Sequence, residues 1–285
     1  MGTNKLPRAA AALLATFVGA SSALGQLGLS RTQLHADGLE ASLAAALANT
    51  ALPPFFLDAS DNELGEKCAR QLAAQLQAAA DKSHGGVDEG GAGSLRGLKL
   101  RGAGLSEAGV AALLAPLAAH TRLQTVDLSS NIRRRMMLPW TDAAVNELGP
   151  ALVALLTRCE RLRTLALGAA DKDAGSVRAV LDGFAAAVAG HTSLTALDVS
   201  IVRFEDSVLD ELAAVLPTNA TLLHLALPPP RKGAASAAAV AADAAIRALL
   251  ERNRAFAARA ARAAPPPLRA FSAAEGAAAA VAAAA

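Results

Sequence analysis

The stretch Leu123–Asn131 reads LQTVDLSSN and fits the spacing L-x-x-L-x-L-x-x-N, with Val126 at one leucine position. Side chains alternate between the two faces of a strand, so Val126 and Leu128 point to one side and the polar residues beside them to the other. Asn131 falls where the chain leaves the strand, and an amide there can hydrogen-bond backbone groups that a bent segment leaves unpaired. One such strand cannot bury its apolar side alone, so the stretch predicts similar strands stacked beside it.

The same register recurs seven times along the 285 residues. Successive copies are 30, 41, 28, 39, 32 and 28 residues apart, so the base period is about 28 residues and the two long intervals contain insertions. The asparagine position is degenerate, because only Asn62 and Asn131 keep the amide. The predicted strands carry their two register residues at Leu27/Leu29, Leu57/Ala59, Leu98/Leu100, Val126/Leu128, Leu165/Leu167, Leu197/Val199 and Leu225/Leu227.

The intervals between strands contain helical patterns, with apolar residues at i, i+3, i+4 and i+7 as in Val110, Leu113, Leu114 and Leu117. Strands that alternate with helices at a short period predict an α/β solenoid. We expect a right-handed horseshoe with parallel strands on its concave side and helices on its convex side. The predicted helices are Arg8–Val18, Glu40–Ala48, Glu66–Ala80, Glu107–Ala119, Ala143–Arg158, Ser176–Ala189, Asp206–Leu216 and Ala237–Arg254.

Two segments resemble the strand-to-helix part of a known repeat. LGEKCARQL at 64–72 and LSEAGVAAL at 105–113 are similar to that part of the ribonuclease-inhibitor type of leucine-rich repeat, whose α/β unit has 28 residues. The resemblance covers roughly residues 9–254. Ran GTPase-activating proteins and the sensor arms of NOD-like receptors contain the same repeats, so the resemblance implies a protein-binding solenoid. The chain departs from these relatives in its asparagine position, its insertions and its Ala-rich tail, and it lacks a P-loop and the acidic tail of Ran GTPase activators.

The predicted organisation is a repeat domain at residues 1–254 with an N-terminal helix and a C-terminal helical cap, followed by a tail at 255–285. The tail is rich in Ala and Pro and lacks large apolar groups, so we expect it to be disordered or transiently helical. Residues 1–23 fit either a secretory signal or the first repeat helix. We prefer the helix, because Ser21–Leu24 leads into Leu27 as His191–Leu194 leads into Leu197. Two cysteines cannot form a disulfide framework, which favours the reducing cytoplasm.

Composition argues against several function classes. The net charge is only +2 and no basic stripe with interleaved aromatics appears, so we expect neither nucleic acid nor a membrane surface as a partner. We find no nucleophile–base–acid set, no metal-ligand spacing and no cofactor loop, so we predict no enzyme activity and no cofactor. His120, Cys159, His191 and Asn219 each lie three residues before the first leucine of a strand, and this shared register predicts helix-end residues rather than ligands.

Two surfaces are candidates for binding a protein partner of unknown identity. The first is the row of strand side chains on the concave face, where charge alternates between neighbouring strands. The second is the Arg133–Trp140 insertion, which is basic and apolar and holds the only Trp, a residue type that is common in binding hot spots. The candidate partner-binding residues are Phe56, Asp58, Lys99, Arg101, Asp127, Asp198, Arg133, Arg134, Arg135 and Trp140.

Three alternatives stay open at this point. The charged strand residues could pair with one another across strands and only keep the face soluble. Trp140 could pack on a helix end while the arginines beside it are solvated. The chain could also be a GTPase regulator similar to Ran GTPase activators, with Arg31 or Arg101 stabilising charge on a transferred phosphoryl group.

Overall fold

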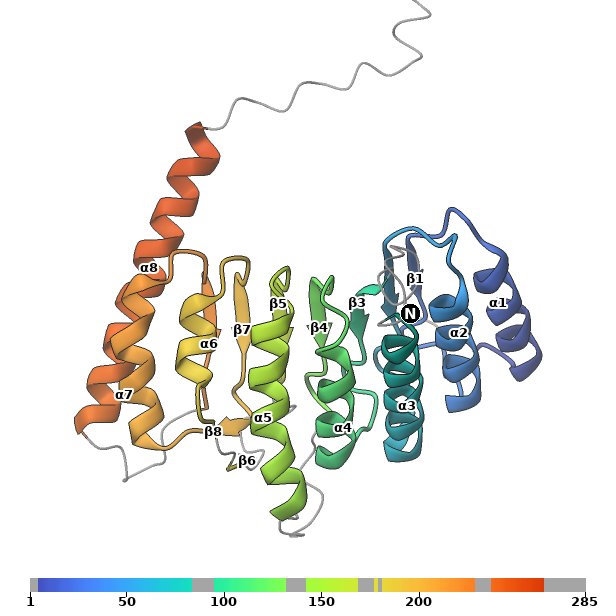
Figure 1. The fold of residues 1–285 in the computed structure, drawn as a ribbon, viewed down its shortest axis with the longest axis horizontal. Coiled ribbons are helices and arrows are strands. Elements are labelled where there is room, and N and C mark those ends of the chain that lie inside the picture. Colours follow the sequence, from blue (N-terminus) through green and yellow to red (C-terminus); the bar gives the residue numbers. More distant parts are fainter. Residues whose placement is uncertain are drawn as a thin grey trace, which may run out of the picture.

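The computed structural model describes residues 5–83, 95–131, 142–168, 177–178, 181–228 and 237–263. Within these ranges the helices form one layer and the strands of the main sheet form a second layer behind them (Figure 1). The Gly-rich insertion (84–94), the Arg133–Trp140 insertion and the end of the tail (264–285) lie outside the described residues. The predictions made for those segments stay predictions.

Seven strands form one parallel sheet in the order β1-β2-β3-β4-β5-β7-β9. Their register aligns Leu27, Leu57, Leu98, Val126, Leu165, Leu197 and Leu225, the residues that mark the repeat in the sequence. The fold is therefore the predicted α/β solenoid of the leucine-rich-repeat type. The strands are β1 Gln26–Gly28, β2 Phe55–Asp58, β3 Leu95–Lys99, β4 Thr125–Asp127, β5 Thr164–Ala166, β7 Ala196–Asp198 and β9 His224–Ala226.

Each strand of the sheet is followed by a helix that packs on the helix of the neighbouring repeat. The first helix lies against the second with Ala11 and Val18 buried, as the helix interpretation of residues 8–18 predicted. The helices are α1 Arg8–Ala20, α2 Ala36–Ala48, α3 Gly65–Ser83, α4 Glu107–Leu117, α5 Asp142–Arg158, α6 Phe184–Gly190, α7 Asp206–Val215 with the 3-10 turn η1 Leu216–Thr218, and α8 Ala237–Ala263.

Two helix predictions need correction. The segment Ser176–Ala189 is helical only from Phe184, because Val177–Arg178 forms strand β6, which pairs with β8 (Val202–Arg203). Gly183 precedes the helix with φ of 78°, a left-handed conformation that an α-helix cannot continue through. The cap helix α8 runs to Ala263, nine residues beyond the predicted end at Arg254, because the alanines that follow favour helix formation.

The core lies between the sheet and the helices. Leu98, Val126 and Leu165 are completely buried in consecutive strands, and Phe55 and Phe184 are the largest of the fully buried side chains in the described residues. Burying a side chain of this size contributes about 1.5–3 kcal/mol, and the contribution is repeated in every turn of the solenoid. The repeated leucine therefore explains both the strands and their stacking.

A first series of side-chain hydrogen bonds, the strand-end ladder, consists of Asn62 and Asn131 at the ends of β2 and β4. Asn131 Nδ2 donates to Leu128 O (2.9 Å) in its own repeat and to Leu100 O (2.7 Å) in the preceding one. Its Oδ1 accepts from Ala103 N at 2.7 Å. One pair of repeats earlier, Asn62 Nδ2 donates to Leu29 O and Ala59 O, and its Oδ1 accepts from Leu34 N. Both asparagines are buried, as their predicted role requires.

A second series, the helix-end ladder, runs along the opposite edge, where the helices end and the strands begin. Each residue of this ladder follows one helix or lies within it, and it hydrogen-bonds carbonyl groups near the end of the helix in the preceding repeat or just after that helix. Asn49, which follows α2, donates from Nδ2 to Val18 O of α1 at 2.9 Å. Asn253, inside α8, continues the series by donating to Asn219 O and Leu222 O, both at 3.0 Å. The ladder comprises Asn49, His120, Cys159, His191, Asn219 and Asn253. This confirms the predicted helix-end role of the four residues singled out in the sequence.

Candidate protein-binding face

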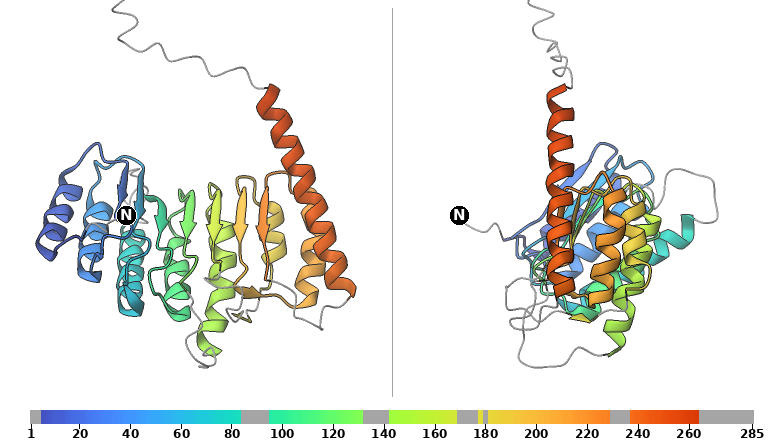
Figure 2. Two further views of the ribbon diagram at one scale, coloured as in Figure 1. Left: turned by 180° about the vertical axis from the view of Figure 1, so that it is seen from behind. Right: turned by 90° about the vertical axis from the view of Figure 1, so that its left-hand side faces the viewer.

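The side of the seven-stranded sheet that the helices do not cover, here called the strand face, is visible when the molecule is seen from behind (Figure 2). Asp58, Lys99 and Asp127 are direct neighbours in its register, one on each of three consecutive strands. Adjacent strands lie about 4.8 Å apart, so these three charges are held in one short row. The whole row is Gly28, Asp58, Lys99, Asp127, Ala166, Asp198 and Ala226.

Phe56 lies in the preceding row, beside Gly97 of the neighbouring strand. A Cβ built on Gly97 would lie 2.4 Å from Cδ1 of Phe56, so the ring occupies the space that any larger side chain at that position would need. The ring is half-buried against the glycine backbone. Phe56 is therefore a fixed aromatic surface on the strand face, with one side of it exposed.

The three aspartates of the row have the same local structure. Oδ1 of Asp58, Asp127 and Asp198 accepts the backbone N–H of the serine two residues later, at 3.0 Å in each case. This is an Asx turn, which bends the chain as it leaves the strand. The motif Asp-x-Ser at 58–60, 127–129 and 198–200 is a sequence signal for this turn, and the predictions above did not include it. One oxygen of each carboxylate is thus engaged, which fixes the direction of the other.

Lys99 and Arg101 are exposed, and neither makes an ion pair with any residue that the structure describes. The expected alternative, in which the charges of the row pair across strands, is not what the described residues show. The aspartates on either side turn toward their own serines instead, and Asp127 Oδ1 also accepts from Ser129 Oγ at 2.6 Å. The ammonium group of Lys99 remains available to a partner.

Arg31, one candidate for the GTPase-regulator alternative, is engaged within the chain. Its Nε donates to Oδ2 of Asp61 at 2.9 Å, although 73% of the arginine side chain is exposed. The equivalent position in four repeats has a left-handed backbone conformation, with φ between 56° and 61°. The residues at this position are Arg31, Asp61, Gly102 and Ser130. A Cβ on Gly102 would lie 2.6 Å from Oδ1 of Asp61, so the turns of neighbouring repeats are packed closely here.

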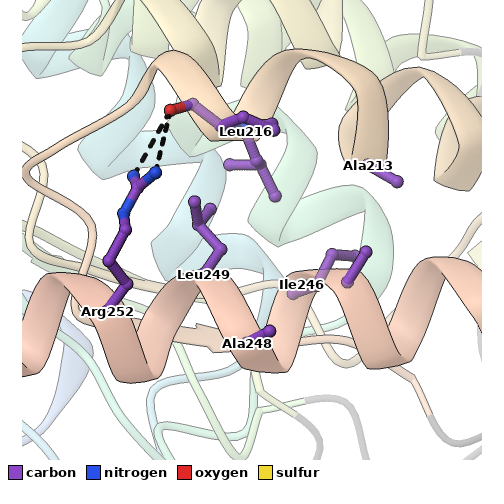
Figure 3. A pocket seen from close by; sticks show the side chains of 8 residues that line it. Ala213, Leu216, Ile246, Ala248, Leu249 and Arg252 are labelled. Carbon is purple, nitrogen blue, oxygen red and sulfur yellow. Dashed lines mark hydrogen bonds between the residues drawn. The ribbon is translucent and has the colours of Figure 1, made fainter.

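A hollow of about 260 Å³ lies between α7, η1 and α8 at the C-terminal end of the solenoid (Figure 3). Leu216, Ile246 and Leu249 make most of it apolar, and Nη1 and Nη2 of Arg252 both donate to Pro217 O at 3.3 Å beside it. The lining has one charged group, and that group already has an acceptor. The hollow therefore belongs to the packing of the cap helix.

Within the described ranges, no group of three or more His, Cys, Asp and Glu side chains could hold a metal ion. No helix in those ranges has the length and apolar character needed to cross a membrane. Of the predicted binding residues, the structure brings Phe56, Asp58, Lys99 and Asp127 together, while Arg101 follows β3 and Asp198 lies three strands away from Lys99. The predicted residues Arg133, Arg134, Arg135 and Trp140 lie outside the described ranges.

No family model matches the chain, and no curated protein matches it in sequence. Among solved structures, the tropomodulin C-terminal domain from Caenorhabditis elegans is similar over 88% of this chain and 97% of that chain, with 12% sequence identity and a TM-score of 0.37. The leucine-rich-repeat-type fold follows from the strand order, the register and the asparagine bonds described above, and the similarity adds no argument about activity or partner.

Proposed function

We propose that the chain is a non-enzymatic scaffold that binds another protein through the strand face, with the Arg133–Trp140 insertion as a second contact. The observation that carries this proposal is the ammonium group of Lys99, exposed and without an ion pair in the described residues, between two carboxylates that are fixed by their own turns. A partner carboxylate can reach Lys99 and Arg101, and partner N–H groups can donate to Asp58 and Asp127.

Rigidity of the face supports the proposal. Asn131 binds two successive repeats to each other, and the Asx turns hold the aspartates at the strand ends. Side chains that are fixed before binding lose little conformational entropy on association, so even modest contacts yield useful affinity. Phe56 supplies apolar contact area in the adjoining row of the strand face, where its ring is held against Gly97.

The test is affinity capture followed by mass spectrometry with four forms of the full chain. The native chain is compared with Lys99→Ala/Arg101→Glu and with Trp140→Ala. Lys67→Ala/Arg70→Glu on α3 is the matched control, because it makes the same change in charge on the helix side of the solenoid. We expect the strand-face variant to lose partners that the control retains. If all forms capture the same partners, the strand face and the insertion are not the binding site.

Two finer assignments belong to the same proposal. The base period of about 28 residues with one helix per repeat favours the ribonuclease-inhibitor type of leucine-rich repeat. Cys68 and Cys159 are both buried free thiols, which suits a protein that works in the reducing cytoplasm. Capture of partners from a cytosolic extract, and none from a secretory-compartment extract, is the expected result.

A further inference from the structure

The edge at which the strands begin gathers arginines from separate repeats. Arg163 N donates to Gln124 O at 2.8 Å, and Gln124 N donates to Arg96 O at 2.7 Å. These three residues therefore lie side by side where consecutive strands begin. Arg122 and Arg161 each lie four residues before the central register residue of their strand, so they too share one level of the edge.

Arg96, Arg122 and Arg161 lie near one another. Arg96 is only 9% exposed, and its Nη1 donates to Arg122 O at 3.4 Å. Burial lowers the pKa of Arg96, and the positive charges of Arg122 and Arg161 lower this pKa further, which requires both to be near it. Arg161 and Arg163 are exposed and Arg122 is half-buried. None of these last three makes an ion pair with a residue that the structure describes.

Helix α8 extends the same edge at the C-terminal end of the solenoid. Arg254 Nε donates to Leu223 O at 2.7 Å, and Leu223 directly precedes β9, so the helix crosses the strand-start edge at this residue. Residues 255–263 then project beyond the sheet (Figures 1 and 2). Arg259 and Arg262 are exposed on the projecting turns. This part of the helix contains no acidic residue.

We propose that this basic edge, formed by Arg122, Arg161, Arg163 and the projecting end of α8, is a docking surface for an acidic polypeptide segment. Charge complementarity identifies the occupant, because planar guanidinium groups pair well with carboxylates in two-point contacts. The surface is separate from the strand face and does not depend on the function proposed there. Neighbouring repeats along this edge are one strand spacing apart, so an extended peptide segment can cross several repeats.

A polypeptide fits this edge better than a nucleic acid does. Glu160 directly precedes Arg161 in the chain, and Glu251 directly precedes Arg252, so negative charges alternate with the arginines in the sequence. A polypeptide can place its carboxylates only where arginines face it, whereas every phosphate of a nucleic acid is charged. Sequence-tolerant binding of single strands also uses aromatic stacking. Phe256 is the one exposed aromatic side chain near the described part of this edge.

The test is fluorescence anisotropy of a labelled twelve-residue peptide of alternating Glu and Ser, added to the full chain at low salt. Alternate side chains of an extended peptide lie on one face, so its carboxylates can face the edge together. We expect saturable binding that weakens as salt is raised, and a loss of about tenfold in affinity for Arg122→Gln/Arg161→Gln/Arg163→Gln. The matched control, Lys67→Gln/Arg70→Gln/Arg247→Gln, removes the same charge from exposed helix positions and retains the affinity.

Three results would overturn the proposal. One is equal affinity for the native chain and the edge variant while circular dichroism shows both folded. Another is equal binding of a peptide of alternating Gln and Ser, which would mean that charge is not recognised. The last is tighter binding of a twelve-nucleotide thymidine strand that the edge variant loses, which would identify a nucleic-acid surface. Lys99→Ala leaves peptide binding unchanged if the two surfaces are separate, so failure of one proposal leaves the other standing.

Discussion

The two edges of the solenoid hold successive repeats together with ladders of very different completeness. On the strand-end ladder only two of seven repeats keep the asparagine that the repeat pattern calls for. On the helix-end ladder six side chains form a nearly continuous series from Asn49 to Asn253. All asparagine side chains that the structure describes belong to one ladder or the other. The edge with the recognisable motif is therefore the less complete one.

The geometry of the bonds explains why the incomplete ladder is sufficient in the first half of the molecule. Asn62 serves its own turn through Ala59 O and the preceding turn through Leu29 O and Leu34 N. Asn131 serves the next two turns in the same way. Each asparagine thus bonds backbone groups in two turns, and the two asparagines together serve four turns. Ala103 can replace an asparagine because the amide of Asn131 already binds its backbone N–H.

The largest effect is expected from Asn131→Ala. The substitution leaves two carbonyl groups and one or two N–H groups buried without partners, and each such group costs about 1–3 kcal/mol. We expect the free energy of unfolding to fall by about 3–5 kcal/mol, measured by urea denaturation. Ser129→Ala, two residues earlier and half-buried, is the control and should change it by less than about 1 kcal/mol. Equal effects of the two substitutions would contradict the shared-asparagine interpretation.

Asn253→Ala tests the other ladder at its last position. The side chain is buried and donates to Asn219 O and Leu222 O, so its loss should detach the cap helix from the last repeat. We expect a loss of about 2 kcal/mol in the free energy of unfolding and faster amide exchange in α8 than in α4. Arg247→Ala on the exposed side of α8 is the control. Unchanged exchange in α8 would show that its apolar contacts alone hold the cap.

The fold was predictable from the sequence because it depends on a repeated local pattern. Leucines at a fixed spacing give the strands and their register, and a period of two assigns Asp58, Lys99 and Asp127 to one face. The helix-end role of His120, Cys159, His191 and Asn219 was also predictable from their shared position. Their hydrogen bonds were not, because the donors that bond the carbonyl groups belong to three different residue types, which no single sequence pattern groups together.

Other features depend on neighbours that are distant in the sequence. Phe56 contacts Gly97 across 41 residues, and nothing local to either residue indicates the contact. The basic edge was missed for the same reason. No basic stripe is visible in the sequence, because Arg96, Arg122 and Arg161 are separated by a full repeat and become neighbours only when the repeats stack. The end of α8 was predicted nine residues too early, because the Ala-rich composition after Arg254 was assigned to the tail.

His191 should make stability depend on pH. Its Nδ1 accepts from Leu194 N at 3.1 Å, while its Nε2 lies 3.1 Å from Cys159 O. Burial lowers the pKa of His191, although the hydrogen bond to Cys159 O and the charge of Glu160 oppose the shift. A histidine whose pKa is lower in the folded state binds protons more readily when unfolded, so stability is full above about pH 6.5 and falls as the pH drops toward the folded pKa.

The expected result is a lower melting temperature at pH 5.5 than at pH 7.5, by a few degrees. Each unit of difference in pKa corresponds to about 1.4 kcal/mol. His191→Gln keeps a donor and an acceptor but does not titrate, so its melting temperature should change less between the two pH values. His224→Gln, at an exposed position on β9, is the control and should keep the native dependence. The same slope in native and His191→Gln chains would assign the dependence elsewhere.

The smallest effect on stability is expected at Cys159, the weakest hydrogen-bond donor of the helix-end ladder. Its Sγ lies 3.6–4.0 Å from the carbonyl oxygens of Leu117, Ala118 and His120. Burial raises the pKa of this thiol to about 12, so it stays protonated and keeps its hydrogen for these acceptors at neutral pH. Cys159→Ser supplies a stronger donor in a smaller side chain, so we expect a change within about 1 kcal/mol in either direction. Because the thiolate is the reactive form, the native thiol should react with Ellman's reagent only as fast as the helix-end edge opens. Reaction as fast as that of the urea-unfolded chain would show that Cys159 is not held in the ladder.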